Sequence, residues 1–197
     1  MRNRLNKLAA VATLTLCATI LPTYSAKAAE STSIEVRSAS LEPGEYVWQP
    51  QNSPEGDVVV VVSLQLQKAF VYRGDGLIGM STISSGKAGH ETPTGTFEIL
   101  QKRREHYSNL YDNAPMPFMQ RLTWSGVALH AGQIPGYPAS HGCVRLPNAF
   151  ARHLFGVTEL GATVHIVDRP LSPDDALAIA TNNIRVGAPV ELASGLD

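Results

Sequence analysis

Five consecutive valines, Val58 to Val62, constrain the fold more strongly than any other segment of this 197-residue chain. β-Branched side chains favour extended backbone, and an unbroken apolar run is typical of a strand that is covered on both faces. Leu64 and Leu66 then alternate with polar residues. The pattern predicts a strand that begins fully buried and becomes half exposed, inside a domain large enough to cover both of its faces.

Several more short strands follow, separated by turn residues. Gly74-Asp75-Gly76 lies between two strand candidates, 68–73 and 77–84, which predicts antiparallel neighbours joined by a tight loop, and so a β-meander. Shorter candidates occur at 46–48, 96–100, 127–130 and 162–167. Helical spacing over 148–155 and the helix start at Ser172-Pro173 predict one or two short helices. The expected fold is therefore mainly β.

Residues 101–120 carry no regular pattern but contain several aromatic residues and prolines. A loop of that length inside a compact domain is usually functional or mobile. We expect this stretch to act as a lid. The cluster Lys102-Arg103-Arg104 within it is expected to be a solvated loop or strand end.

The N-terminus has the features of a cleavable signal peptide, residues 1–28. Arg2, Arg4 and Lys7 precede an apolar stretch over 8–21, and Ala26-Lys27-Ala28 supplies a small-residue cleavage pattern. An uncleaved N-terminal anchor is the alternative. Residues 29–57 are expected to form an N-terminal arm on the domain, and residues 169–197 a C-terminal tail with a peripheral helix. No stable membrane insertion is expected after cleavage, since no later apolar run approaches the length of a membrane span.

Charge then argues against a nucleic-acid partner. Cleavage would remove four basic residues and no acidic one, which changes 16 basic and 17 acidic groups into 12 and 17, a net charge of −5. Phosphate binding needs a basic face, and the mature chain is mildly acidic. The predicted signal peptide instead indicates an exported protein, in the periplasm or cell envelope.

Cys143 is the cysteine that remains once Cys17 leaves with the signal peptide. In an exported protein a lone cysteine is a leftover, pairs with another chain, or serves as a nucleophile or ligand. A thiol attacks a carbonyl as thiolate, so it needs a base, and His130 and His141 are both near in sequence. His130 ends an apolar strand that can hold its ring rigidly, which favours it as the base. Gly142 allows close backbone approach, and successive N–H groups in such a turn can stabilise an oxyanion.

A cysteine in this setting has two other possible roles. Cys143, His141, His130 and His153 together could ligate zinc, but their spacing matches no familiar zinc site. A structural cysteine, buried as a small hydrophobe, fits poorly with the glycine, histidine and arginine around it. We therefore expect no metal and no cofactor, and the pattern favours acyl transfer through a thioester.

Four ordered segments of the sequence resemble the L,D-transpeptidase catalytic domain, also called the YkuD domain. They are Ser85-Gly86-Lys87, Thr92-Pro93-Thr94-Gly95, Met116-Pro117-Phe118-Met119, and the run from His130-Ala131-Gly132 through Gly136 to Ser140-His141-Gly142-Cys143-Val144-Arg145-Leu146. The resemblance covers residues 58–168, the expected catalytic domain. It implies a β-sandwich with one or two short helices.

The resemblance also implies a substrate and a reaction. Such enzymes act on the tetrapeptide stems of peptidoglycan: a cysteine attacks the carbonyl at the L-centre of a diamino acid, D-alanine leaves, and an amine resolves the thioester. The acceptor is a neighbouring stem, the lysine of a wall-anchored lipoprotein or a free D-amino acid. The expected partners are therefore peptidoglycan peptide stems and an acceptor protein.

Roles carried over by the resemblance follow the matching positions. Cys143 matches the nucleophile and His130 the general base and acid, with the carbonyl of Ala131 orienting it. The resemblance implies oxyanion N–H groups from Gly142 and Cys143, with Ser140 and His141 in support. Arg145 is the candidate for binding a substrate carboxylate, and the expected groove walls are Tyr137, Phe118 and Met119.

Two other functions stay open on the sequence alone. A cysteine hydrolase, such as an L,D-carboxypeptidase or an amidase-type enzyme, would use the same thioester and resolve it with water, because the outcome depends on loop closure and desolvation. A non-catalytic wall-binding protein on the same fold is the third reading, against which the intact Cys143 and His130 argue. The spacing of 13 residues between His130 and Cys143 is short, which predicts a trimmed loop and a more open groove.

Overall fold

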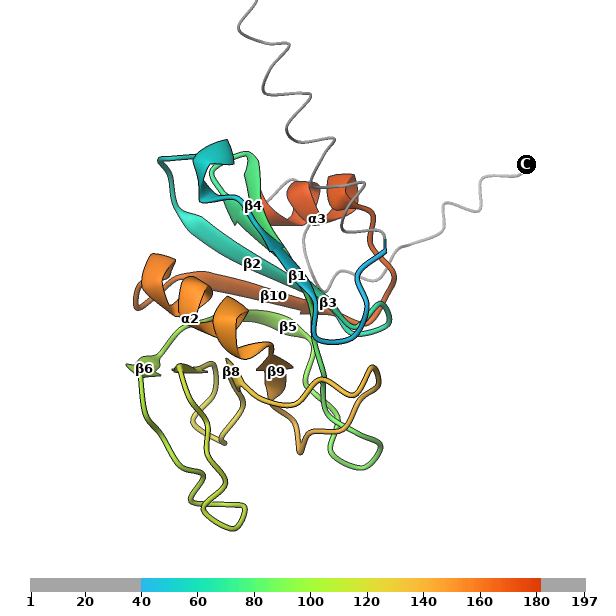
Figure 1. Ribbon diagram of the computed structural model, residues 1–197, viewed down its shortest axis with the longest axis vertical. Helices are drawn as coiled ribbons and strands as arrows, with labels where there is room; N and C mark the ends of the chain where they lie inside the picture. The colour runs from blue at the N-terminus through green and yellow to red at the C-terminus, as the bar shows by residue number, and fades with distance from the viewer. Residues whose placement is uncertain (1–39, 182–197) are drawn as a thin grey trace, which may run out of the picture.

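The computed structural model describes residues 40–181 (Figure 1). The expected signal peptide, Cys17, residues 29–39 of the expected arm and the tail beyond Thr181 lie outside the described residues. Within them no helix is long and apolar enough to cross a membrane.

Residues 40–181 form two β-sheets and two short α-helices, which confirms the mainly β fold. The large sheet has the strand order β1-β4-β3-β2-β10-β5, built from β1 (Tyr46–Trp48), β2 (Val58–Ser63), β3 (Lys68–Arg73), β4 (Gly76–Thr82), β5 (Gly95–Glu98) and β10 (Thr163–Val167). The small sheet has the order β6-β7-β8-β9, built from β6 (Gln101–Arg103), β7 (Met119–Arg121), β8 (Ala128–Ala131) and β9 (Val144–Leu146). The helices are α2 (Asn148–Val157), α3 (Pro173–Ala180) and a 3-10 turn, η1 (Pro50–Asn52).

The predicted meander is β2-β3-β4, in which consecutive strands pair antiparallel. On the other side of β2 the chain returns with β10, which pairs parallel to it. The valine strand therefore lies inside the large sheet, hydrogen-bonded on both sides.

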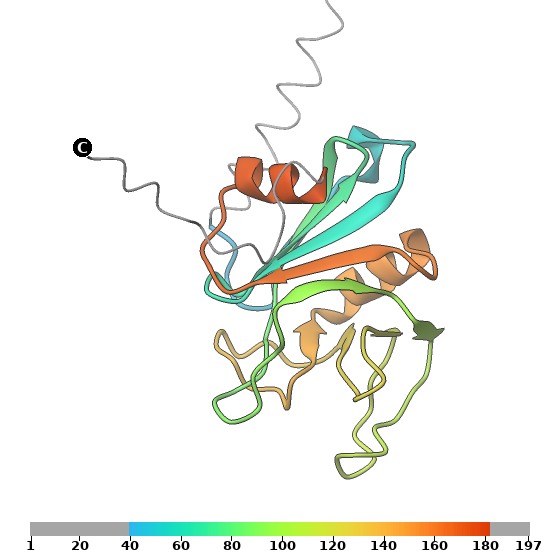
Figure 2. The same cartoon turned by 180° about the vertical axis from the view of Figure 1, so that it is seen from behind.

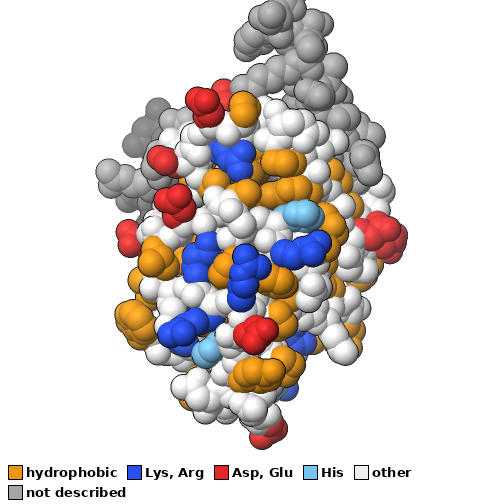
Figure 3. All heavy atoms as spheres, turned by 60° about the vertical axis from the view of Figure 1, so that its left-hand side comes forward, with side chains coloured by type: hydrophobic (Ala, Val, Ile, Leu, Met, Phe, Trp, Pro, Cys, Tyr) orange, Lys and Arg blue, Asp and Glu red, His pale blue; other side chains and the backbone are white. Residues whose placement is uncertain are grey.

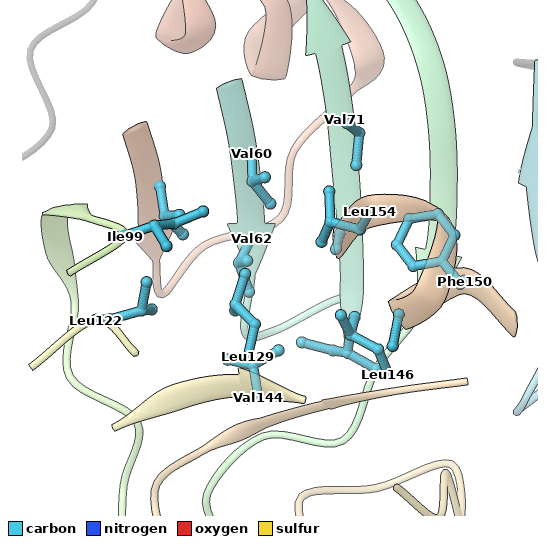
Figure 4. Close-up of a cluster of buried hydrophobic side chains, with 14 of the residues drawn as sticks. Val60, Val62, Val71, Ile99, Leu122, Leu129, Val144, Leu146, Phe150 and Leu154 are labelled. Carbon is cyan, nitrogen blue, oxygen red and sulfur yellow. The ribbon is translucent and has the colours of Figure 1, made fainter. Parts of the chain in front are cut away.

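Both faces of the large sheet are covered, which explains the valine run. Val60 and Val62 point into a central core that the large sheet shares with the small sheet and with α2 (Figure 4). Val61 points the opposite way, into a second core closed by Ala176 and Ile179 of α3. Figure 2 shows α3 over one face of the large sheet and the small sheet beyond the other. A strand between two cores has no polar face, so alternation is absent.

The predicted gradient of burial along this strand is wrong. Val58 and Val59 are half-buried, whereas the strand is buried from Val60 to its end at Ser63. Residues 64–67 form a turn instead of a half-exposed extension. Ser63 Oγ donates to the carbonyl of Arg169 at 2.6 Å and accepts from the N–H of Leu66 at 3.3 Å, which ends the strand at a side-chain hydrogen bond that alternation does not reveal.

The stretch expected to be an irregular lid is a hairpin. Its ends are β6 and β7, which pair antiparallel, and residues 104–118 between them extend away from the small sheet (Figure 1). The two arms stay joined beyond the strands, because Phe118 N–H donates to Arg104 O at 2.8 Å and Met116 N–H to His106 O at 2.8 Å. Three-residue strands with polar ends fall below what periodicity detects.

Lys102 lies on β6 and is less solvated than expected. Its ammonium donates to the carbonyls of Phe155 (2.8 Å) and Thr158 (2.5 Å) at the end of α2, and lies 4.4 Å from the centre of the Phe155 ring. Figure 3 shows basic side chains interspersed with apolar ones on one face of the molecule.

Both predicted helices are present. α2 buries Phe150, Ala151 and Leu154 against the central core. α3 begins at the predicted point: Ser172 Oγ accepts from the N–H of Asp175 at 3.1 Å, and the Asp175 carboxylate accepts from the N–H of Ser172 at 3.0 Å. This capping box satisfies donors that the first turn leaves without helical partners.

Candidate active site

The parallel pairing of β8 with β9 decides which side chains meet in the site. The register places Leu129 beside Val144, His130 beside Arg145 and Ala131 beside Leu146. The apolar members of these pairs lie in the central core: Leu129, Ala131, Val144 and Leu146. Since side chains alternate along a strand, His130 and Arg145 face the other way, together with Cys143 two residues before Arg145.

This second face opens into a cavity of about 650 Å³. Its wall contains Cys143, His130, Arg145, Ser140 and His141, five residues expected in the site, and the rest comes mainly from β7, the 104–118 hairpin and the turn before β8. Two arginines and three histidines line the cavity, and none of its described lining residues is acidic. The charges of the two arginines, with no carboxylate in the lining to offset them, therefore make the cavity positive.

His130 is held as a neutral base. Its ring is 7% exposed, and Nδ1 lies 2.8 Å from the carbonyl oxygen of Ala131. A carbonyl only accepts, so Nδ1 carries the proton and Nε2 is left with a lone pair. Burial lowers the pKa of His130 to about 4, with further lowering by the charge of Arg145, against an opposing effect of the Ala131 hydrogen bond.

The thiol of Cys143 is half-buried and protonated in the resting state. Burial raises the pKa of Cys143, and this outweighs the lowering by the Ala128 backbone and by the charges of Arg145 and Arg121. Sγ donates to the carbonyl of Gly126 at 3.5 Å. The resting site is therefore a neutral thiol and a neutral imidazole in one cavity, in contrast to a preformed ion pair.

Ser140 organises the turn that carries the thiol. It is 1% exposed, and its hydroxyl donates to the carbonyl of Cys143 at 2.5 Å and accepts from the N–H of Gly142 at 3.1 Å. Gly142 has a φ of +114°, a conformation that glycine adopts readily. Because the Gly142 N–H is engaged by Ser140, the N–H of Cys143 is the better candidate for an oxyanion donor.

A group of buried hydroxyls fixes this turn from the large-sheet side. Thr92 Oγ1 donates to the carbonyl of Gly142 at 2.9 Å and accepts from the N–H of Gly86 at 2.8 Å. Ser85 O accepts from the N–H groups of Ala139 and Ser140, both at 3.0 Å. A Cβ on Gly86 would lie 2.0 Å from the carbonyl oxygen of His90, so the close approach of Gly86 to residues 90–92, which include Thr92, requires glycine there. Sequence reasoning assigned these residues no physical role, although they lie in the segments that carried the resemblance.

The expected groove walls separate into two groups. Met119 is buried and lines the cavity. Phe118 lies outside its lining, has a backbone φ of +55° and packs edge-on to Phe155. Tyr137 also lies outside the lining and is 62% exposed. The periodicity of a short strand after a loop cannot show which side chain faces the site.

His141 connects the cysteine turn to the hairpin. Its exposed ring stacks on Tyr111 with centroids 4.5 Å apart and an interplanar angle of 26°, and His90 packs edge-on to it at 4.8 Å. The hairpin therefore forms a wall of the cavity beside the nucleophile. Sequence reasoning also missed Arg121, Trp124 and His106 in the lining, because each is an isolated residue in a short strand or loop.

The described residues contain no group of three or more His, Cys, Asp or Glu arranged to hold a metal ion. Cys143 forms no disulfide. What the arrangement can do chemically is transfer a thiol proton to an imidazole while sulfur attacks an electrophilic carbon in a positive cavity.

A family model, the L,D-transpeptidase catalytic domain (YkuD), matches residues 57–166, more than half of the chain. The protein belongs to this family.

Solved L,D-transpeptidases share this fold. The protein from Stackebrandtia nassauensis is 28% identical with a TM-score of 0.53, over 58% of this chain and 57% of that one. That from Xylanimonas cellulosilytica is 27% identical with a TM-score of 0.51, over 57% and 61%. That from Mycobacterium smegmatis is 22% identical with a TM-score of 0.53, over 56% and 58%, and supports the fold alone. No curated protein matches the chain.

This L,D-transpeptidase domain spans 57–61% of the length of those solved proteins. Family membership rests on the family model, and the shared fold on the solved structures. An additional solved L,D-transpeptidase, 25% identical with a TM-score of 0.52 over 56% of this chain and 58% of that one, is in complex with imipenem.

Proposed function

We propose that this protein is an L,D-transpeptidase that acts on peptidoglycan tetrapeptide stems through a thioester on Cys143. The observation that carries the proposal is a neutral base in the same cavity as the nucleophile: the Nδ1–H of His130 donates to the Ala131 carbonyl, and His130 and Cys143 both line the cavity. Family membership supports the choice of substrate class.

The first half-reaction breaks the bond between the diamino acid L-centre and D-alanine. Cys143 Sγ attacks the carbonyl carbon as His130 Nε2 takes the thiol proton. The tetrahedral oxyanion is stabilised by the N–H of Cys143 and by the positive cavity. The imidazolium then gives its proton to the departing amine of D-alanine, and the acyl group remains on sulfur as a thioester.

The second half-reaction reverses the roles. An acceptor amine attacks the thioester, His130 takes a proton from the amine, and the thiolate leaves and is reprotonated. The product is a new amide, as in a 3→3 cross-link, a lipoprotein attachment or an exchanged terminal D-amino acid. Water in place of the amine would give the carboxypeptidase reaction. We propose that the protein works outside the cytoplasm, in the cell envelope or periplasm; the proposed wall substrate and the signal-like N-terminus support this location.

The test combines product analysis with trapping of the nucleophile. Purified protein is incubated with a disaccharide tetrapeptide, alone and with an added D-amino acid, and products are identified by mass. We expect loss of D-alanine and formation of a dimer or an exchanged stem. Incubation with imipenem should add one acyl group to Cys143 in the intact mass.

Cys143→Ala and His130→Ala serve as the matched variants. Cys143→Ala should form no adduct and no product, and His130→Ala should slow acylation by about 10²–10⁴-fold, the usual contribution of a positioned base. A Cys143→Ala protein with full activity would overturn the mechanism. Tripeptide as the sole product, with acceptor present, would identify a hydrolase instead.

A further inference from the structure

Arg121 occupies a position in the cavity that the proposed chemistry does not use. It ends β7 and lines the cavity that contains Cys143 and Arg145. β7 and β9 lie on opposite sides of β8, which carries His130, and the register sets Arg121 beside Ala128. The two arginines thus approach the site from the two strands that flank the base, and both charges lower the pKa of Cys143 against the effect of burial.

The guanidinium of Arg121 is held in place by neighbours that leave its outer edge free to bind. Its Nε–H donates to Gln101 Oε1 at 3.0 Å, and its central carbon lies 5.9 Å from the ring centroid of Trp124. Neither contact engages the terminal Nη atoms. Trp124 is 74% exposed and also lines the cavity. A planar fork fixed in this way is suited to a bidentate ligand.

The charge of Arg121 has no acidic counterpart in the cavity. None of the described lining residues is Asp or Glu, and Arg121 lies close enough to His106 to lower the pKa of that ring after the larger effect of burial. Two uncompensated guanidinium groups in one half-enclosed site favour a ligand with two negative charges over a ligand with one.

We propose that Arg121 is a specificity-determining residue that binds a second carboxylate of the donor stem, while Arg145 binds the first. The preferred donor is then a stem whose D-glutamyl and diamino acid side-chain carboxylates are both free, one bound on each side of β8, and amidation of either one weakens binding. This inference rests on the proposed function, since it names the form of the stem that the site accepts.

The experiment measures binding separately from turnover. Cys143→Ala protein, which binds without reacting, is titrated calorimetrically with three synthetic tetrapeptide stems: one with all carboxylates free, and two in which the carboxylate of the D-glutamyl residue or of the diamino acid side chain is amidated. Adding Arg121→Gln should raise Kd for the free stem by about 10- to 100-fold, the usual range for a charged hydrogen-bonded pair. The same substitution should leave Kd unchanged for the stem in which the carboxylate bound by Arg121 is amidated. It should raise Kd for the other amidated stem.

Two controls make the outcome specific. Arg103→Gln removes the same charge from the exposed end of β6, outside the cavity lining, and should change Kd by less than about twofold. Arg121→Lys keeps the positive charge but not the paired N–H donors of the guanidinium, and should bind the free stem more tightly than Arg121→Gln but less tightly than Arg121. Thermal unfolding of each variant shows whether the loss of the Gln101 contact affects the fold.

An equal loss of affinity for all three stems in the Arg121→Gln background would overturn the inference, as would no loss at all. Failure of the wild-type protein to turn over any stem would count against the proposed function instead. Carboxylate-dependent binding by the Cys143→Ala protein can be observed in either case.

Discussion

At the scale of single residues, the site depends on keeping two titratable groups uncharged. Burial raises the pKa of Cys143 and lowers that of His130 to about 4, so at neutral pH the thiol keeps its proton and the imidazole can accept one. Proton transfer then accompanies attack on the substrate. The thiol is thereby protected from adventitious electrophiles until a carbonyl is in position, since the thiolate is the reactive form.

This state predicts an unusual pH dependence. kcat/KM should stay level from about pH 8 to 5 and decline as pH falls through about 4, because protonated His130 cannot accept the thiol proton. A histidine of ordinary pKa would place that decline near 6.5. Initial rates across pH 3–8 measure it. A midpoint near 6.5 would contradict the neutral, desolvated base.

The fold must be followed in the same titration. The folded pKa of His130 lies below its unfolded value of 6.5, so the unfolded chain binds more protons between those two values. The resulting stabilisation is complete above pH 6.5 and is lost as pH falls toward 4, a contribution of about 3 kcal/mol. Circular dichroism at each pH separates unfolding from loss of the base.

Sequence reasoning found Cys143, His130 and Arg145 because they lie in one run of chemically distinctive residues. It did not find Arg121 or Trp124, because each stands alone among unremarkable neighbours and is brought to the cavity by strand pairing at a distance. Phe118 shows the reverse case: the sequence predicts it in the groove wall, whereas the structure has it outside the cavity lining with its ring against Phe155.

At the scale of elements, hydrogen bonds from two buried hydroxyls hold the cysteine turn. The Thr92 hydroxyl connects the carbonyl of Gly142 to the N–H of Gly86, and the Ser140 hydroxyl donates to the carbonyl of Cys143 within the turn. The backbone before the nucleophile is in this way joined to loops of the large sheet. The position of the thiol relative to β8 follows from these hydrogen bonds.

Thr92→Val tests this arrangement with an isosteric change. It would leave the carbonyl of Gly142 and the N–H of Gly86 without their hydroxyl partner, and each such buried group costs about 1–3 kcal/mol. We expect the free energy of unfolding to fall by roughly 2–4 kcal/mol and kcat/KM to fall with it. Urea denaturation and acylation rates measure both effects.

Thr92→Ser is the control, because serine keeps the hydroxyl at the same position. It should retain most of the stability and activity. If the valine and serine variants behave alike, the hydroxyl does not position the turn.

At the scale of the whole molecule, the two cores explain why one strand can carry only valines. The central core joins both sheets and α2, and the second core lies between the large sheet and α3. The long strands of this arrangement were predictable, since their apolar runs are unambiguous. The small sheet was only partly predictable, because three-residue strands such as β6 and β7 are defined by partners across a hairpin.

Leu154 on α2 tests how far the central core governs stability. It is fully buried among residues of both sheets, so Leu154→Ala should lower the free energy of unfolding by about 2–5 kcal/mol. Leu160, six residues later, is 65% exposed, and Leu160→Ala should change it by less than about 0.5 kcal/mol. Urea melts of the two variants compare them directly, and equal losses would contradict a core centred on α2.

The parallel pairing of β8 and β9 has one more consequence. Parallel strands cannot be joined by a tight turn, so the chain leaves the sheet after Ala131 and returns at Val144. From Tyr137 onward the returning segment is hydrogen-bonded to Ser84 and Ser85. Gln133 to Pro135 lie before the first of these hydrogen bonds. A chain cut at these residues would leave the base and its strand on one fragment and the nucleophile and its strand on the other, and the hydrogen bonds to Ser84, Ser85 and Thr92 would then join the two fragments. Recovery of acylation on mixing would then report the reassembly of the two pieces.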